Sequence, residues 1–303
     1  MKTLQYMITQ NCNSPACKHC MLWVKKVNGE LSFNEFKQLF DNPHQFKNID
    51  VTGGEPFLRD DINQHFEYLS KQKIDKLSIT TNGILQDRII EAAKTSINSN
   101  VKYKFWLSFD GMEEQNDFMR SKGAFDKSMN TLESLLFFQN HNFRIGISTT
   151  LNDYNSTAFP AMQQFFGAYG LDLKSINVPN VSNFYSNKKN KYTSLAPEHV
   201  PEHINHRDAI VQYLKTGDTK YQCSSPQNKL VLDSFGNIRA CSQQWTDDFV
   251  VGNIREHDYD LNKLLEKNAD KYAEVCRRAS IKDCNKCFTI CEYSSWSSMH
   301  NDK

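Results

Sequence analysis

The chain has 303 residues, of which 39% are hydrophobic and 23% are charged, and it contains 20 Phe and 12 Tyr. This composition supplies a sizeable core and excludes a disordered or collagen-like chain. The 36 basic and 35 acidic residues leave a net charge of +1, so we expect no nucleic-acid or membrane partner. No apolar run approaches the roughly 18 residues of a transmembrane helix, and the first residues lack the pattern of a signal peptide. These features predict a cytoplasmic protein of about two domains.

The first 180 residues alternate short apolar or β-branched runs with helical patterns. Ser32 and Glu35 have the spacing of a capping box that opens the first helix. Strands are predicted at residues 4–9, 49–52, 77–81, 104–109, 144–150 and 173–178, and helices at 33–40, 60–72, 86–95, 125–138 and 156–169. Such repeats predict an α/β fold with a parallel sheet, either a partial TIM-like barrel or an open, doubly wound sheet.

Polar and glycine-containing motifs follow the predicted strands. In chain order they are Gly53-Gly54-Glu55-Pro56 after the second strand, Asn82-Gly83 after the third, Ser108 and Asp110 at the fourth, and Asn152 at the fifth. Parallel α/β folds build their sites at the carboxyl ends of the strands. We therefore expect these residues to belong to one site.

The sequence changes character after the sixth strand. Residues 180–191 are polar and aperiodic, which predicts a loop or lid. Further on, a helix is predicted at 201–215, a β-hairpin at 230–241 and a helix at 261–277. The predicted divisions of the chain are a barrel over residues 1–180, a linker with a helix over 181–222, and a small Cys-rich α+β domain over 223–303.

Nine cysteines lie in two groups near the two ends of the chain. Clustered thiols in a cytoplasmic chain usually bind metal or perform redox chemistry. The first group is Cys12, Cys17 and Cys20, with the spacing C-x4-C-x2-C. Three thiolates neither close a tetrahedral zinc site nor fully ligate a four-iron cluster, so one iron of a cubane stays open for a substrate or cofactor. The alternatives are a zinc site completed by His19 and three cysteines of the core.

The motifs ITQNCNSPACKHC, VTGGEP, TTNG and SFD together closely resemble the radical S-adenosylmethionine (SAM) superfamily. The resemblance covers residues 4 to about 180 and implies a partial (β/α)6 TIM-like barrel. It also implies that Cys12, Cys17 and Cys20 hold a [4Fe–4S] cluster whose open iron binds the amino and carboxylate groups of SAM. The first gap is one residue longer than in the usual C-x3-C-x2-C, and Pro15 lies in the loop that has to absorb this residue.

The same resemblance assigns cofactor contacts to the motifs at the strand ends. It places Gly53, Gly54 and Glu55 at the methionine amino group of SAM. The other candidate SAM-binding residues are Ser108 and Asp110 near the ribose, His19 near the adenine, Asn82 and Asn152. The family further implies a one-electron donor such as flavodoxin or ferredoxin.

The second group of cysteines resembles the SPASM and twitch extensions of radical SAM enzymes, which carry C-x(9–15)-G-x4-C and a later C-x2-C for auxiliary iron–sulfur clusters. The matching residues are Cys223, Gly236, Cys241, Cys284 and Cys287. The six cysteines of this group cannot fully ligate two clusters, so the resemblance implies one auxiliary [4Fe–4S] cluster held by the four matching cysteines. Cys291 is a possible replacement for one of them, and structural zinc with the same ligands is the alternative.

Together these features predict an enzyme that cleaves SAM reductively to a 5′-deoxyadenosyl radical, which abstracts a hydrogen atom from a small molecule or peptide. The expected outcome is an oxidation, either a dehydrogenation or a cross-link. The alternative is an epimerase with Cys276 as hydrogen donor, although a buried or cluster-adjacent role for this thiol is favoured. Because the first predicted strand begins at residue 4, we expect no N-terminal peptide-recognition domain, and this expectation favours a small molecule or a peptide delivered by a separate partner. A rival of another class is a zinc-stabilised binding protein without catalysis.

Overall fold

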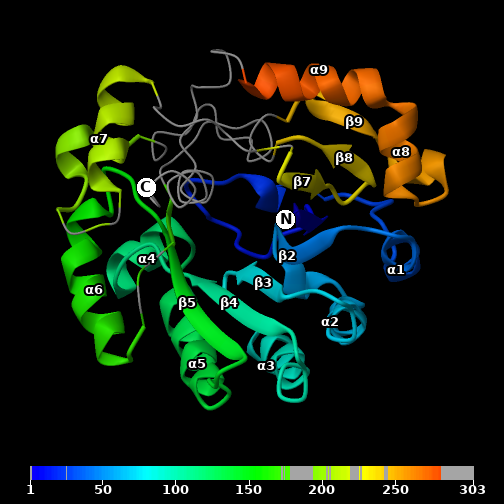
Figure 1. Ribbon diagram of the computed structural model, residues 1–303. Coiled ribbons are helices and arrows are strands. Elements are labelled where there is room, and N and C mark those ends of the chain that lie inside the picture. The colour runs from blue at the N-terminus through cyan, green and yellow to red at the C-terminus, as the bar shows by residue number, and fades with distance from the viewer. Residues whose placement is uncertain are drawn as a thin grey trace.

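The computed structural model describes residues 2–24, 26–171, 173, 175–177, 194–202, 204, 206–218, 225, 227–241 and 245–280 (Figure 1). The strands are β1 (Lys2–Thr9), β2 (Phe46–Gly53), β3 (Lys76–Thr81), β4 (Lys102–Ser108), β5 (Phe143–Thr150), β6 (Ser175–Asn177), β7 (Lys229–Leu232), β8 (Asn237–Arg239) and β9 (Val250–Asn253). The α-helices are α1 (Phe33–Asp41), α2 (Ile62–Leu69), α3 (Gln86–Lys94), α4 (Glu113–Met119), α5 (Ala124–Leu136), α6 (Phe159–Ala168), α7 (Arg207–Thr216), α8 (Leu261–Lys267) and α9 (Ala269–Ser280). Short 3-10 helices occur at Leu22–Val24, Pro56–Leu58, Ser156–Ala158, Pro197–His199, Asp247–Phe249 and Ile254–His257.

The strands form one sheet in the order β6-β5-β4-β3-β2-β1-β7-β8-β9. Strands β1 to β6 pair in parallel, and α1, α2, α3, α5 and α6 lie on the outer side of the curved sheet (Figure 1). This arrangement confirms the predicted α/β fold with a partial (β/α)6 barrel. The capping box of α1 is confirmed as well, because the Ser32 hydroxyl accepts from the Glu35 N–H and the Glu35 carboxylate accepts from the Ser32 N–H.

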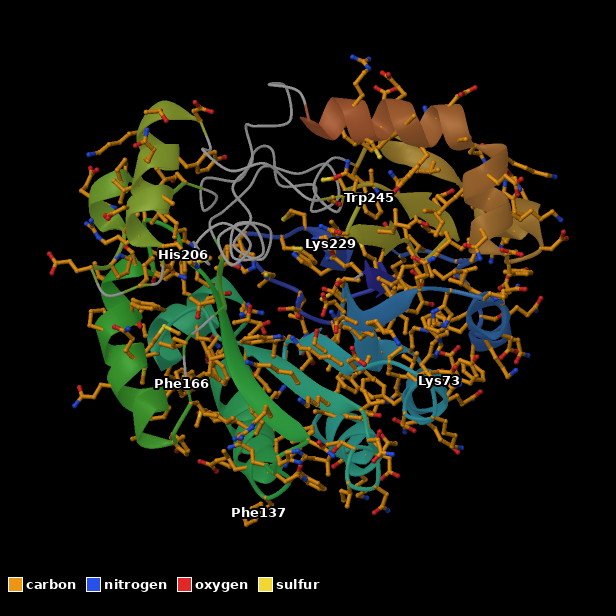
Figure 2. The ribbon with its side chains drawn as sticks, in the orientation of Figure 1. Lys73, Phe137, Phe166, His206, Lys229 and Trp245 are labelled. Carbon is orange, nitrogen blue, oxygen red and sulfur yellow. The ribbon has the colours of Figure 1, made fainter. Side chains whose placement is uncertain are left out.

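The alternation of side chains along the strands separates an apolar outer face from a more polar inner face. Val51, Ile79, Phe105 and Ile145 are register partners on four neighbouring strands, and all are buried in the core beneath the helices. Phe166 of α6 belongs to the same core, whereas Phe137 projects into solvent at the far end of α5 (Figure 2). Burying these large side chains supplies the main driving force for folding.

The neighbouring register row faces the inside of the curved sheet because successive side chains of a strand point to opposite faces. It contains Asp50, Ser78 and Lys104, and the Ser78 hydroxyl donates to the Asp50 carboxylate. On β4 the Lys104 ammonium lies 3.9 Å from the centroid of the Trp106 ring. The inner face is therefore lined by polar and charged groups, in contrast to the outer one.

The predicted C-terminal hairpin is confirmed, and it continues the barrel sheet. β7 pairs in parallel with β1, and β8 pairs antiparallel with β7. Gly236 forms the turn with φ 91°, a backbone conformation that glycine adopts at little cost. Asp233 braces the turn, since its carboxylate accepts from the Asn237 N–H at 2.9 Å and from the Arg239 side chain at 2.8 Å. The division of the chain at residues 180 and 222 stays a prediction.

Several element boundaries differ from the predictions. The predicted helix start at Pro201 is wrong, because α7 begins at Arg207 after His206, whose φ of 63° is left-handed. The predicted helix 261–277 is divided at Asn268, which ends α8, and α9 then runs past its predicted end. The short helix α4 and the strand β9 were not predicted at all. The predicted loop at residues 180–191 lies outside the described residues.

Within the described ranges, the helices are all too short or too polar to cross a membrane.

Candidate functional site

The first cysteine group lies in the loop that follows β1, at the carboxyl edge of the sheet. Cys17 is buried, with 7% of its surface exposed, and Cys12 and Cys20 are partly buried. Cys12 and Cys20 pack against an apolar cluster that contains Met7 of β1 and Val231 of β7. The loop therefore presents its thiols to a largely water-excluded site between the barrel and the C-terminal hairpin.

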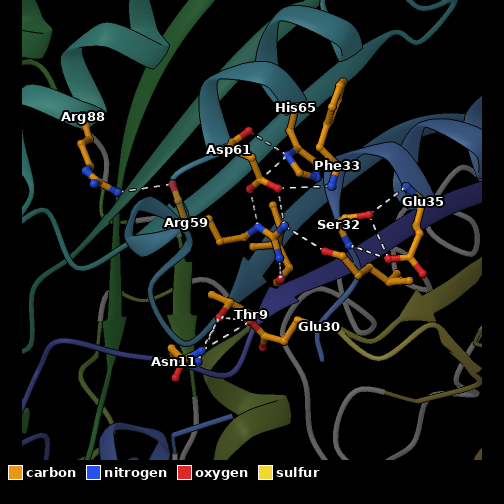
Figure 3. A network of polar contacts seen from close by, with 12 residues as sticks. Thr9, Asn11, Glu30, Ser32, Phe33, Glu35, Arg59, Asp61, His65 and Arg88 are labelled. Atoms are coloured by element: carbon orange, nitrogen blue, oxygen red, sulfur yellow. Dashed lines mark hydrogen bonds and ion pairs between the residues drawn. The ribbon is translucent and has the colours of Figure 1, made fainter. Parts of the chain in front are cut away.

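The start of this cysteine loop is fixed by Glu30 (Figure 3). The Thr9 hydroxyl donates to one carboxylate oxygen of Glu30 at 2.8 Å, and the Gln10 N–H donates to the other at 2.7 Å. The Asn11 N–H in turn donates to the Thr9 hydroxyl at 3.0 Å. These bonds hold the three residues that precede Cys12, and Glu30, which makes two of them, is a residue that sequence reasoning missed.

Arg59 anchors the same end of β1 from the other side (Figure 3). Its guanidinium donates to the Ile8 carbonyl at 3.1 Å and to the Leu31 carbonyl at 2.9 Å, and it forms a two-bonded ion pair with Asp61. A bidentate pair of this kind holds the guanidinium in one orientation. The end of β1 is thus tied to the segment before α1.

Gly53 and Gly54 lie directly against the backbone of the cysteine loop. A Cβ atom at Gly53 would come within 2.2 Å of the Thr9 carbonyl oxygen, and one at Gly54 within 2.0 Å of the Asn11 carbonyl oxygen. This approach lets the Gly54 N–H donate to the Thr9 carbonyl at 2.7 Å. The Glu55 N–H donates to the Asn11 carbonyl at 2.8 Å. Only residues without a side chain fit here, so the two glycines fix the position of the loop; their predicted contact with SAM stays a prediction.

Glu55 is 1% exposed, and its carboxylate is fully engaged by neighbouring groups. It accepts from the Thr81 hydroxyl at 2.8 Å, the Asn82 N–H at 2.8 Å and the Phe57 N–H at 3.1 Å. Burial raises the pKa of Glu55 to about 7, although these bonds act in the opposite direction. The side chain therefore braces the end of β2 against the end of β3, and its predicted contact with the methionine amino group stays a prediction.

Asn82 connects the end of β3 to the cysteine loop. Its side-chain amide donates to the Asn13 side-chain oxygen at 2.7 Å, and its own oxygen accepts from the Ile84 N–H at 3.0 Å. Asn13 lies between the first two cysteines. The structure thus brings the second, third and first motifs of the sequence together, as the strand-end argument predicted.

Asp110 and Asn152 are buried just beyond β4 and β5. The Asp110 carboxylate accepts from the Thr150 N–H at 2.9 Å, and Asn152 accepts from the Tyr154 N–H at 2.9 Å. Asn155, which sequence reasoning missed, donates to the Asp110 carbonyl at 2.9 Å and to the Thr150 carbonyl at 3.0 Å. These bonds join the fourth and fifth strand ends. The predicted SAM contacts of Asp110, Asn152 and the buried Ser108 stay predictions.

His19 lies between a cysteine and a buried carboxylate. Its Nε2 is 3.7 Å from the Cys17 sulfur, and its Nδ1 is 3.5 Å from Asp110 Oδ2. Asp110 Oδ2 is also 2.7 Å from Nη2 of Arg120. Burial lowers the pKa of His19, but the Cys17 and Asp110 charges outweigh this effect and raise it. The predicted position of His19 near the adenine stays a prediction.

The three thiols form a donor set that favours a bound metal cluster. Burial raises the pKa of Cys12 to about 11 and also raises the pKa of Cys20, which the Cys17 charge raises further. Burial alone would raise the pKa of Cys17 too, but His19 and Arg120 hold it below its ordinary value. A positively charged metal centre would relieve the repulsion between three such thiolates.

The three cysteines provide the ligand types of an iron–sulfur cluster. Among the residues that the structure describes, no three His, Cys, Asp or Glu side chains converge closely enough to share one metal ion. A tetrahedral zinc site requires such convergence, whereas in a cubane each cysteine can bind a different iron. Three cysteine thiols are the protein ligands that a [4Fe–4S] cluster with one open iron requires, so the residues present fit such a cluster.

The second cysteine group is described only in part. Cys241 follows β8, where the Ser225 hydroxyl donates to the adjacent Ala240 carbonyl. Cys276 is partly buried on α9, one helical turn after Tyr272. Burial raises the pKa of Tyr272 to about 12, with a smaller contribution from Cys276. The other predicted ligands, Cys223, Cys284, Cys287 and Cys291, lie outside the described residues.

Comparisons with known proteins show which family and which proteins the chain resembles. Residues 6–151 match the family model of the radical SAM superfamily. The chain is 23% identical over 296 residues to the antilisterial bacteriocin subtilosin biosynthesis protein AlbA of Bacillus subtilis, which corresponds to 90% of this chain and 63% of that protein. It is 28% identical over 272 residues to a GTP 3′,8-cyclase of Campylobacter lari, covering 79% of this chain and 77% of that enzyme.

A solved structure shows the same fold. The structure of anSMEcpe with bound AdoMet superposes with a TM-score of 0.64 at 16% sequence identity, over 94% of this chain and 82% of that chain. The chain spans a little less than two thirds of the length of AlbA.

Proposed function

The chain belongs to the radical SAM superfamily, and from this premise we propose that it binds SAM at a [4Fe–4S] cluster held by Cys12, Cys17 and Cys20. When bound, this pair of cofactors supplies one-electron cleavage of SAM to methionine and a 5′-deoxyadenosyl radical. The radical removes a hydrogen atom from an unactivated carbon of the substrate. The observation that carries the proposal is the loop of three cysteines, one buried and two partly buried, held at the carboxyl edge of the barrel.

The residues around the loop position it and exclude water. Gly53 and Gly54 allow the backbone of β2 to contact the backbone at Thr9 and Asn11. Glu55 and Asn82 link the next strand end to the loop. A site that keeps its ligands rigid and dry protects a reactive radical from side reactions, which is the usual contribution of a protein to cofactor chemistry.

For the substrate we favour a bacteriocin-like peptide that is supplied as a separate chain. Support comes from AlbA, whose name places it in bacteriocin biosynthesis and whose match covers 90% of this chain. The reaction is then an oxidation, a dehydrogenation or a cross-link, in which an auxiliary [4Fe–4S] cluster accepts the second electron. Its proposed ligands are Cys223, Cys241, Cys284 and Cys287, with Cys291 as a possible replacement.

A small-molecule substrate is the second candidate. It is favoured by the GTP 3′,8-cyclase relative, which aligns with 79% of this chain and with most of its own length. The polar inner face of the sheet, with Lys104 and Asp50, is compatible with such a ligand. Liquid chromatography with mass spectrometry of a peptide pool and of a nucleotide pool separates the two, because each candidate predicts a new product, seen by its mass or by its retention time, in one pool only.

The reaction type also has a test. An oxidation makes a product lighter by two hydrogens, whereas an epimerase with Cys276 as hydrogen donor leaves the mass unchanged in ordinary water. In deuterated water, the epimerised product gains one deuterium because the thiol proton exchanges with solvent. We propose the oxidation, with flavodoxin or ferredoxin as electron donor and a cytoplasmic location.

Metal analysis tests the class of the protein. After anaerobic reconstitution, two [4Fe–4S] clusters correspond to about eight irons per chain with matching sulfide. A content of about four irons per chain would contradict the auxiliary cluster but would still support the SAM cluster. Zinc alone, without sulfide, would support the non-catalytic binding protein and overturn the proposed function.

A further inference from the structure

We propose that the reduction potential of the cluster at the cysteine loop depends on the balance between the buried charges of Asp110 and Arg120, which act on it in opposite directions. This inference rests on the proposed function, since it requires a cluster bound by that loop. Asp110 and Arg120 are then positioning residues, because they act on the cluster through its ligands.

The pair is rigidly held inside the protein. Asp110 is 0% exposed and Arg120 is 8% exposed, and Nη2 of Arg120 lies 2.7 Å from Asp110 Oδ2. The second carboxylate oxygen accepts from the Thr150 N–H at 2.9 Å. Asn116 of α4 joins both partners, because its side-chain oxygen accepts from the Asp110 N–H and its carbonyl accepts from the Arg120 N–H, each at 2.9 Å.

One imidazole ring separates this ion pair from a proposed cluster ligand. His19 lies 3.5 Å from Asp110 Oδ2 on one side and 3.7 Å from the Cys17 sulfur on the other. The Arg120 carbonyl accepts from the Ser14 hydroxyl at 3.4 Å. The Met119 carbonyl accepts from the Lys18 N–H at 2.7 Å, so the end of α4 is bonded to the loop on both sides of Cys17.

Arg120 has few other partners to share its charge. Its Nε donates to no group in the part of the chain that the structure describes. Arginine stays protonated at every accessible pH, so its contribution is a fixed positive charge. Asp110 is the buried counter-charge, and in the intact pair the two fields largely cancel at the cysteine loop.

Breaking the pair leaves a single charge in a low-dielectric site, where its field is strong. Reduction of the cluster adds one electron from the donor and therefore one negative charge. An unpaired Asp110 opposes this charge, whereas an unpaired Arg120 favours it. Local charge and the hydrogen bonding of the ligands are known determinants of iron–sulfur potentials.

The test is the midpoint potential of the SAM-responsive cluster, measured by EPR during dithionite titration without substrate. We expect Arg120→Met to make reduction about tenfold less favourable, which is a midpoint about 59 mV lower. Asp110→Asn, which keeps the shape of the side chain, should shift the midpoint upward. The double variant should return to near the wild-type value, and Arg120→Lys should preserve that value.

Arg88→Met is the matched control. It removes the same charge from an ion pair with Asp60, in which the Arg88 side chain is 44% exposed and solvent screens the field. Its midpoint should stay at the wild-type value. If Arg120→Met loses iron, the upward shift of Asp110→Asn is still required.

Equal midpoints in Asp110→Asn and wild type, or shifts of the same sign in both single variants, would overturn the inference. A merely structural role predicts such same-sign shifts, because both variants would loosen the same loop. Failure of the proposed function looks different, since the wild-type protein would then assemble no SAM-responsive cluster at all.

Discussion

Replacing Gly54 by Ala tests whether the glycines of the second motif act by holding the cysteine loop. The added Cβ would lie 2.0 Å from the carbonyl oxygen of Asn11 and 2.6 Å from its carbon, and backbone cannot move aside as a flexible side chain can. Overpacking of this kind costs about 1–3 kcal/mol. The Gly54–Thr9 and Glu55–Asn11 hydrogen bonds add about 1 kcal/mol each if they are lost.

We therefore expect Gly54→Ala to lower the free energy of unfolding by about 3–5 kcal/mol. Urea unfolding of the apoprotein measures this change, and iron per chain after reconstitution measures the damage to the loop next to Cys12. Iron at the loop cluster should fall together with stability. The reason is that Asn11, whose backbone would be displaced, directly precedes the first proposed ligand, Cys12.

Gly167→Ala is the control, because a Cβ at this position of α6 meets nothing within 4 Å. It should stabilise the helix by about 1 kcal/mol and leave iron unchanged. The reasoning is refuted if Gly54→Ala keeps wild-type stability and iron content and only loses affinity for SAM. Gly54 would then act at the cofactor alone.

Three further predictions concern Glu55 and Cys276. Burial raises the pKa of Glu55 from 4.5 to about 7, so the stabilising contribution of this side chain is present below pH 4.5 and is lost as pH rises through about 7. In urea unfolding of the apoprotein, the stability advantage of wild type over Glu55→Gln should therefore shrink by about 3 kcal/mol across this range. A difference that stays constant with pH would contradict this prediction. Glu55→Ala should weaken SAM binding in calorimetry while the iron content stays at the wild-type level, and unchanged affinity would remove Glu55 from the SAM site. Cys276→Ala should leave turnover to an oxidised product unchanged, whereas continued 5′-deoxyadenosine formation with little product would assign Cys276 as the hydrogen donor.

The barrel strands could be predicted from the sequence because their apolar residues are buried in the common core of the sheet. Ile79 and Phe105 face the helices as register partners, and such runs carry a local signal. Helix α4 carries no comparable signal, since its seven residues are mostly polar and Asn116 secures it through tertiary contacts. The start of α7 was misplaced because Pro201 suits a helix N-terminus, whereas the left-handed His206 sets the boundary in the structure.

The residues of the candidate site likewise fall into two groups, those that could be predicted from the sequence and those that could not. Its cysteines and the Gly53-Gly54 pair could be found because they form short motifs at strand ends. Arg120 and Glu30 could not, because Arg120 meets Ser14 across 106 residues and Glu30 meets Gln10 across 20. Single charged residues at such separations carry no spacing pattern, and only the fold brings them to the loop.

The most direct test of the account is 5′-deoxyadenosine formation by the anaerobically reconstituted protein with dithionite and SAM. The comparison is between wild type and a variant in which Cys12, Cys17 and Cys20 are all replaced by Ala. The account predicts 5′-deoxyadenosine and methionine from wild type and neither from the variant, which should lose one four-iron cluster and keep any auxiliary cluster. Continued 5′-deoxyadenosine formation by the variant, or its absence from an iron-loaded wild type, would contradict the account.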